Sequence, residues 1–222
     1  MHTTRLSDLN ELALTVRDDI SRSYIMEAVV SYQSGNYRAA ILSAWIAVTY
    51  DIISKLRELA AGHDPNAKKF VEDLDNAAVQ HNIPHLQRIE GGLLELALKD
   101  FEFLSLHEHT DLARLRDDRH LCAHPTLTRD DTLFQPTPEL VRTHIVHSIM
   151  HLLQHQPVQG KSALERIVSD LKSPAFPSDT ENVAAYLNNK YFDRAKPALV
   201  RNAVIVLIKT TISIKPYGKV CP

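Results

Sequence analysis

The chain has few glycines, few cysteines and no large excess of charge of either sign, and each shortage excludes a class of protein. Six glycines in 222 residues argue against an all-β chain with many tight turns and against a glycine-rich phosphate loop. Two cysteines, Cys122 and Cys221, make no disulfide framework and favour a reducing compartment. The formal net charge of -2 excludes a globally basic nucleic-acid coat, although a local basic site stays possible.

Long apolar runs are scarce as well. The most apolar stretch, residues 203–214, is interrupted by Lys209 and is too short to span a bilayer. The first residues are polar and then amphipathic, without a secretory signal pattern. We therefore expect a cytoplasmic protein with no membrane partner.

Apolar residues recur at spacings of three and four along almost the whole chain, which predicts an all-α fold. The clearest helix begins at Tyr37 and ends at Gly62, with Gly35-Asn36 as the break before it. In the last predicted helix, β-branched residues leave a strand as an alternative. The other helices are predicted at residues 9–20, 22–34, 64–79, 86–106, 108–123, 137–155, 162–172, 179–189 and 194–214.

Two non-periodic segments divide this helical pattern. Residues 125–136 are predicted to form a loop of about a dozen residues, a length often associated with function. Residues 156–161 are the best candidate for a linker. We therefore predict a helical bundle over residues 1–157 and a helical C-terminal extension over residues 158–222.

The densest polar cluster lies at residues 114–125 and contains Arg119, His120 and His124. Pro125 disfavours the helical conformation for the residue before it, so His124 is predicted at or just beyond a helix end. Arginine offers a permanently charged planar fork for phosphate, and histidine moves protons near neutral pH. Arginine and histidine without a metal suit RNA cleavage, where the 2′-hydroxyl is already the nucleophile. The alternative is a set of solvated cations that complement the helix dipole.

The spacing from Arg119 to His124, with polar His120 after the arginine and Ala-His-Pro at the close, resembles the Arg-x(4–6)-His signature of HEPN domains. Residues 32–51, from Tyr32 through Gly35-Asn36 to Asp51, resemble the opening helical hairpin of the same family. The resemblance covers about residues 20–157. It implies a small, often dimeric helical bundle in which the motifs of two protomers face each other.

Many HEPN domains are metal-independent ribonucleases of antiviral defence, abortive infection or toxin–antitoxin systems. The resemblance assigns Arg119 and His124 to the catalytic pair and His120 to the polar position between them. It implies an RNA substrate, a homodimer, a possible antitoxin or other defence-system subunit, and no cofactor or metal. The alternative is a non-catalytic HEPN-like interaction or regulatory module of such a system.

Neighbouring residues are interpreted more simply. Asp51 could orient the site from the opening hairpin, but an exposed position is the stronger expectation for an aspartate within a helix. Arg114 and Arg116 are expected to pair locally with Asp111, Asp117 or Asp118. Cys122 is expected to be a small core residue and no nucleophile.

Four further histidines, at positions 144, 147, 151 and 155, fall within about 80° of one another on a helical projection. We expect this to be a solvated face. His147 and His151 are also spaced so that both could hold zinc, although no glutamate accompanies them in a His-Glu-x-x-His pattern. His107 and His109 are likewise expected at the surface.

Overall fold

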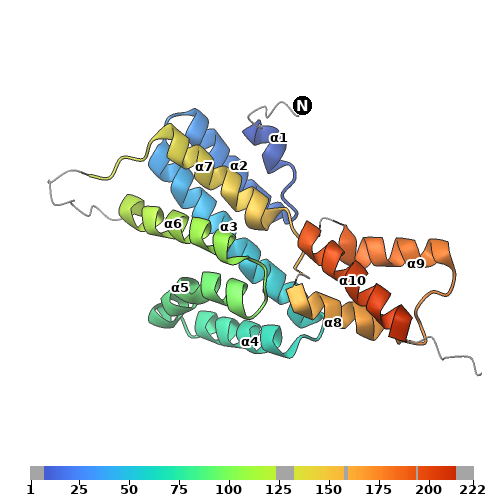
Figure 1. The fold of residues 1–222 in the computed structure, drawn as a ribbon. Helices are drawn as coiled ribbons and strands as arrows, with labels where there is room; N and C mark the ends of the chain where they lie inside the picture. The colour runs from blue at the N-terminus through green and yellow to red at the C-terminus, as the bar shows by residue number, and fades with distance from the viewer. Residues whose placement is uncertain (1–7, 124–132, 158–159, 194, 214–222) are drawn as a thin grey trace, which may run out of the picture. The chain divides into compact units, whose positions relative to one another are not determined.

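The computed structural model describes residues 8–123, 133–157, 160–193 and 195–213, and every regular element in them is helical, which confirms the all-α prediction. The chain divides into two compact units, Met1–Pro157 and Val158–Pro222. Figure 1 shows the helices of both units. The helices of the first unit are α1 (Leu9–Ala13), α2 (Asp19–Gln33), α3 (Tyr37–Ala61), α4 (Pro65–Val79), α5 (Ile83–Lys99), α6 (Leu106–Ala123), α7 (Pro138–Ser148) and the π-helical η1 (Ile149–Leu153).

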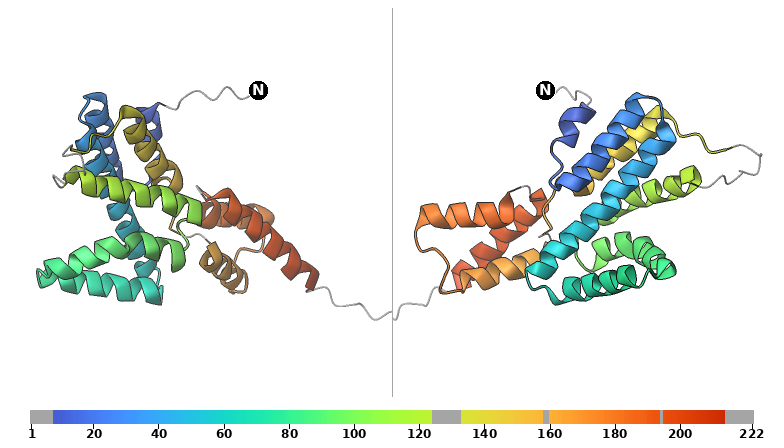
Figure 2. Two further views of the ribbon diagram at one scale, coloured as in Figure 1. Left: turned by 60° about the vertical axis from the view of Figure 1, so that its left-hand side comes forward. Right: turned by 180° about the vertical axis from the view of Figure 1, so that it is seen from behind.

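Helix α3 forms the centre of the first unit. It packs against α2, α4, α6 and α7, and the rear view in Figure 2 shows it passing between the other helices of the unit. Ile41, Ile52 and Leu56 have no exposed surface. Each contributes about 1.5–3 kcal/mol through removal of its side chain from water. The unit is therefore held together around one long apolar helix.

Gly35 makes the turn that lets α2 and α3 pack as a hairpin. Its φ of 76° lies in the left-handed region, where a residue with a Cβ is disfavoured. The Asn36 N–H donates to the Ser31 carbonyl at 2.8 Å, a contact typical of a helix that ends at glycine. The predicted break at Gly35-Asn36 is confirmed.

Helix α3 is also the one described helix that is long and apolar enough to cross a membrane. Of its most apolar window, 61% is buried inside the protein, as in the core helix of a globular domain.

Two predicted helix boundaries are wrong. The pattern at residues 9–20 does not form one helix, because Asp18 caps α2 by accepting a hydrogen bond from the Ser21 N–H at 2.8 Å. The pattern at residues 86–106 breaks after Lys99, where Glu102 has a φ of 52°. Phe101 and Phe103 are buried on either side of Glu102. Apolar spacing alone does not reveal that these aromatic side chains enter the core from a turn.

The second unit is a small bundle with its own core. The unit comprises α8 (Gly160–Leu171), α9 (Thr180–Leu187), the π-helical η2 (Asn188–Phe192) and α10 (Pro197–Ser213). The core consists of Ile167, Tyr191 and Ala203. The strand alternative for α10 is excluded, since Ala203 lies on the helical face that packs against α8.

Asp170 organises polar contacts in this second unit. Its Oδ2 accepts hydrogen bonds from the hydroxyls of Tyr186 and Tyr191 at 2.9 and 2.5 Å, and from Lys190 Nζ at 2.7 Å. These three donors hold the carboxylate in its charged form and lower the pKa of Asp170. The carboxylate therefore links α8 to α9 and η2.

Candidate functional site

His120 lies in the last turn of α6 and Arg119 lies directly before it, so a well-packed helix positions both residues. Leu112 and Leu115 of the same helix are fully buried, and Cys122 is 7% exposed, which confirms the expectation of a core cysteine. Burial also raises the pKa of the Cys122 thiol, so that it stays in its unreactive form. His124, the third residue of the predicted site, lies outside the described residues.

The Arg119 guanidinium is held by a carboxylate from another helix. Its Nη2 donates to Glu90 Oε1 of α5 at 2.6 Å. The same oxygen accepts a hydrogen bond from Trp45 Nε1 of α3 at 2.8 Å. Because two helices fix Glu90 and its partner indole, Arg119 is presented in a defined orientation at the end of α6.

Arg119 and His120 border one cavity of about 450 Å³. Arg119 Nη1 lies 3.4 Å from His120 Nδ1, so the guanidinium and the imidazole are neighbours. Glu90 contacts Nη2 of Arg119 and His120 contacts Nη1. An arginine side chain has five N–H donors, so these two contacts do not use all of them. The cavity is lined by Leu42, Trp45, Ile46, Gln87, Glu90, Gly91, Arg116, Arg119, His120 and Ala123.

Local pairing of the other two arginines of α6 is confirmed. Arg114 Nη1 lies 3.3 Å from Asp111 Oδ1, and Arg116 Nε lies 3.3 Å from Asp117 Oδ1. Arg116 nevertheless lines the cavity beside Arg119. The cavity therefore has two guanidinium groups in its lining, each with a carboxylate partner.

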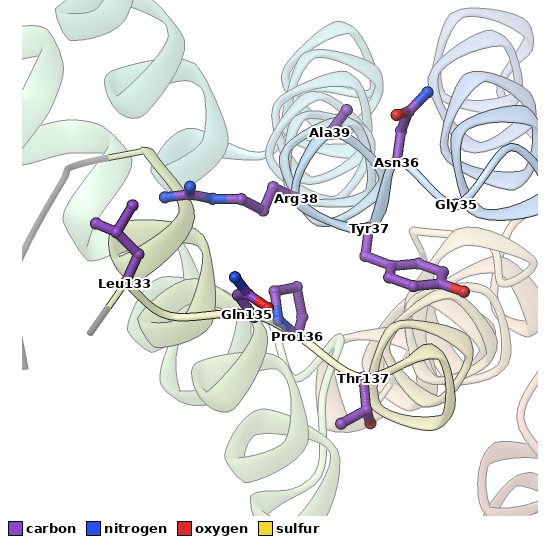
Figure 3. Close-up of a pocket in the computed structure, with 9 residues that line it drawn as sticks. All are labelled: Gly35, Asn36, Tyr37, Arg38, Ala39, Leu133, Gln135, Pro136 and Thr137. Carbon is purple, nitrogen blue, oxygen red and sulfur yellow. The ribbon is translucent and has the colours of Figure 1, made fainter.

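A second cavity, of about 720 Å³, lies between the start of α3 and the segment that precedes α7. Figure 3 shows Arg38 extending toward Leu133 and Gln135 across this cavity. The Arg38 Nη2 atom lies 3.5 Å from the carbonyl oxygen of Leu121, within the predicted motif. Local spacing does not identify Arg38 as a site residue, although its place at the start of a helix after the Gly35 turn can be read from the sequence.

The prediction of a solvated histidine face is wrong for His144. This residue is 3% exposed, and its Nε2 lies 2.7 Å from Asp118 Oδ2 of α6. The helix that carries it, α7, packs against α6, so the imidazole enters the helix interface instead of solvent. The interface provides the carboxylate that makes burial of this polar side chain possible.

His147 and His151 also face α6, where Asp111 is buried at 5% exposure. Asp111 Oδ2 lies 3.2 Å from His151 Nε2, 3.4 Å from His147 Nδ1 and 3.5 Å from His107 Nε2. Burial lowers the pKa of His147 and thereby favours the neutral imidazole. His107 is exposed as expected, whereas the His109 side chain is 13% exposed and lies 3.1 Å from Glu95.

Asp51 is not exposed, contrary to the stronger expectation, and its carboxylate pairs with Lys55, not with the predicted site residues. It is fully buried in α3 and forms an ion pair with Lys55, one helical turn along. Lys55 Nζ also donates to the Leu152 carbonyl of η1 at 3.1 Å. Asp51 therefore joins a buried polar group that connects α3 to η1.

Comparisons with family models, with curated proteins and with solved structures find no match to this chain.

Proposed function

We propose that the protein is a HEPN-type, metal-independent endoribonuclease that acts in antiviral defence or abortive infection, or as a toxin. The observation that carries the proposal is that Arg119, His120 and Arg116 line one cavity at the end of the helix that leads to His124. The cavity combines phosphate-binding cations with an imidazole. An active ribonuclease of this kind would work in the cytoplasm on RNA.

The proposed reaction needs only groups that the motif and the substrate supply. The 2′-oxygen of the RNA attacks the adjacent phosphorus while its proton passes to a base. The bond from phosphorus to the 5′-oxygen breaks, and that oxygen takes up a proton. His124 acts as general base or acid, Arg119 neutralises the phosphate, and His120 orients or assists. The products are a 2′,3′-cyclic phosphate and a 5′-hydroxyl.

Glu90 is a positioning residue in this proposal. It fixes Arg119 through one guanidinium nitrogen, so a phosphate would be bound by the donors on the rest of the guanidinium. Arg38 extends the positive charge on the other side of the motif, near Leu121. A local cluster of cations supports RNA binding on a chain whose formal net charge is -2.

The Arg119–Glu90 ion pair also favours a second candidate, a non-catalytic helical module that binds another subunit of a defence system or an antitoxin. In that case the pair would be structural, because the Glu90 carboxylate already balances the charge of Arg119. RNA cleavage distinguishes the two candidates.

We expect RNA cleavage to continue in EDTA, because the proposed chemistry uses no metal. The measurement is incubation of the purified protein with mixed RNA in EDTA, followed by analysis of the product ends. Cyclic-phosphate and 5′-hydroxyl ends are expected. Activity that EDTA abolishes and Mg²⁺ or Mn²⁺ restores would contradict the proposed mechanism, and absence of cleavage from the folded protein under both conditions would favour the regulatory module.

We also expect a homodimer in which the cavities of two protomers face each other. Ile46 lines the cavity and is 42% exposed, so it offers an apolar rim next to Arg119. Light scattering at micromolar concentration should give about 50 kDa, twice the 25.0 kDa of one chain. Ile46→Asp should shift the protein to the monomer and lower its activity, because the new charge would be desolvated at the interface. A monomer that cleaves RNA without a partner would contradict this prediction.

A further inference from the structure

Asp111, His147 and His151 place one carboxylate oxygen and two imidazole nitrogens within 4.8 Å of one another. We propose that these three side chains bind a divalent transition-metal ion, and that zinc is the ion their donor set fits best. Imidazole and carboxylate are both common zinc ligands. This site is additional to the proposed ribonuclease function, which does not use it.

The two distances from the Asp111 carboxylate oxygen are close to those of a zinc site, and the two imidazole nitrogens lie within 4.8 Å of each other. With metal–ligand bonds of about 2.1 Å, two ligands of a tetrahedral zinc ion lie about 3.4 Å apart. Asp111 Oδ2 lies 3.2 Å from His151 Nε2 and 3.4 Å from His147 Nδ1. His107 Nε2 lies 3.5 Å from the same oxygen but is not one of the three donors that lie within 4.8 Å of one another, so the fourth position is open to water. Only small side-chain movements are needed to close the site around an ion.

Hydrogen bonding alone explains the cluster poorly. The imidazoles of three histidines lie near one oxygen of Asp111. The His151 contact, at 3.2 Å, has hydrogen-bond geometry, whereas those of His107 and His147 are ion-pair contacts at 3.5 and 3.4 Å. The rings of His147 and His151 lie with their centroids 4.6 Å apart, so both imidazoles are held beside the same carboxylate. A bound cation would accept a lone pair from each ring and balance the charge of the buried carboxylate.

The surroundings provide support and access. Arg114 donates to Oδ1, the other oxygen of Asp111, and so orients the carboxylate while leaving Oδ2 for the ion. The side chain of His107 is 83% exposed, which leaves an entry route from solvent. His147 lies in the last turn of α7 and His151 in η1, and π-helical turns occur often at functional sites.

A bound ion would cross-link α6 to α7 and η1, the helices whose interface also contains the Asp118–His144 pair. The expected role is therefore structural. We expect zinc to bind the full chain, freed of any polyhistidine tag and stripped with EDTA, with a stoichiometry of one. At about 100 times the dissociation constant, the unfolding temperature should rise by about 5–10 °C. The measurements are calorimetric titration with ZnCl₂ and thermal unfolding with and without the metal.

Substitutions separate this site from the other histidines of the chain. His147→Ala and His151→Ala should each remove the zinc-dependent rise in unfolding temperature. His155→Ala, one turn beyond His151, should keep it, and Arg114→Ala should weaken zinc binding about 10–100-fold. Absence of one-to-one binding to the wild-type protein would overturn the proposal. A rise that persists in both ligand variants would also overturn it, because another site would then bind the metal.

Discussion

Arg119→Ala is expected to lower the rate of RNA cleavage by about 10²–10³-fold, the usual cost of removing one preorganised donor to a developing negative charge. Its effect on stability should be much smaller. The Arg119 and Glu90 side chains are 23% and 37% exposed, and partly exposed ion pairs contribute about 1 kcal/mol or less. Such a loss lowers the unfolding temperature by about 2–4 °C in a chain of this size. Initial rates with a labelled RNA and thermal unfolding measure the two effects separately.

Two variants control this experiment. Arg57→Ala removes an arginine that also pairs with a carboxylate, Asp75, at 2.5 Å but lies outside the cavity, so activity should stay within a few-fold of wild type. Arg119→Lys should restore activity only in part, because an ammonium group lacks the bidentate fork. Equal activity of Arg119→Ala and wild type would remove Arg119 from the proposed site.

His124→Ala tests the proton-transfer step. Loss of a general acid or base costs about 10²–10⁴ in rate. His147→Ala is the histidine control, because His147 belongs to the proposed metal site and not to the motif. Its activity, measured well below the unfolding temperature of the variant, should stay within a few-fold of wild type. Equal losses in the two variants would place the working site on the α7 and η1 histidines. An unchanged ribonuclease with His124→Ala would leave a helical module without the proposed activity.

Most of the helices could be predicted from the sequence, because the apolar spacing and the capping residues that define a helix lie within the helix itself or next to it. Asp64-Pro65 begins α4 as expected, with the Asp64 carboxylate accepting from the N–H groups of Asn66 and Ala67 at 3.0 Å. Pro84 lies in the break predicted between residues 79 and 86, but in the structure it belongs to the first turn of α5, after the cap formed by Asn82. Proline is compatible with both places, because a first-turn residue needs no N–H donor to its own helix. Only the Asn82 cap shows that Pro84 belongs to the start of α5.

The partners of the site residues could not be predicted in the same way, because they come from other helices. Glu90 is 29 positions before Arg119, and no local spacing connects them. The contacts of α6 with α7 and η1 do have a signal in the sequence. Asp111 and Asp118 are seven residues apart, as are His144 and His151. The structure pairs Asp111 with His151 and Asp118 with His144. Two antiparallel helices with such spacings bring both pairs together.

The buried ion pair of α3 is the residue pair whose disruption should cost the most stability. Asp51 and Lys55 are 0% and 1% exposed, and burial shifts both toward their neutral forms: it raises the pKa of Asp51 and lowers that of Lys55. Asp51 Oδ1 has no hydrogen-bond partner among the described residues. The carboxylate therefore depends on Lys55 for the compensation of its charge.

Lys55→Met is expected to lower the free energy of unfolding by about 3–5 kcal/mol, because it keeps a similar volume but leaves the Asp51 carboxylate buried without its partner. The Leu152 carbonyl of η1 also loses its donor. The pKa of Asp51 is raised from its ordinary value of 3.8 to about 6 in the folded state, so folding takes up a proton at pH values between these two. Stability from this group therefore falls as the pH rises. The deficit of the variant should be smaller at pH 5 than at pH 8 in urea unfolding experiments.

Asp51→Ala/Lys55→Met provides the matched control, since it removes both charges. Replacement of a buried ion pair by apolar side chains is often neutral, whereas removal of one partner is strongly destabilising. The double variant should therefore recover most of the stability that Lys55→Met loses, and the part of the pH dependence that comes from Asp51 should be absent from it. If the double variant were less stable than Lys55→Met at pH 8, the unpaired Asp51 charge would not be the cause of the loss. Packing of the Lys55 side chain between α3 and η1 would then account for it.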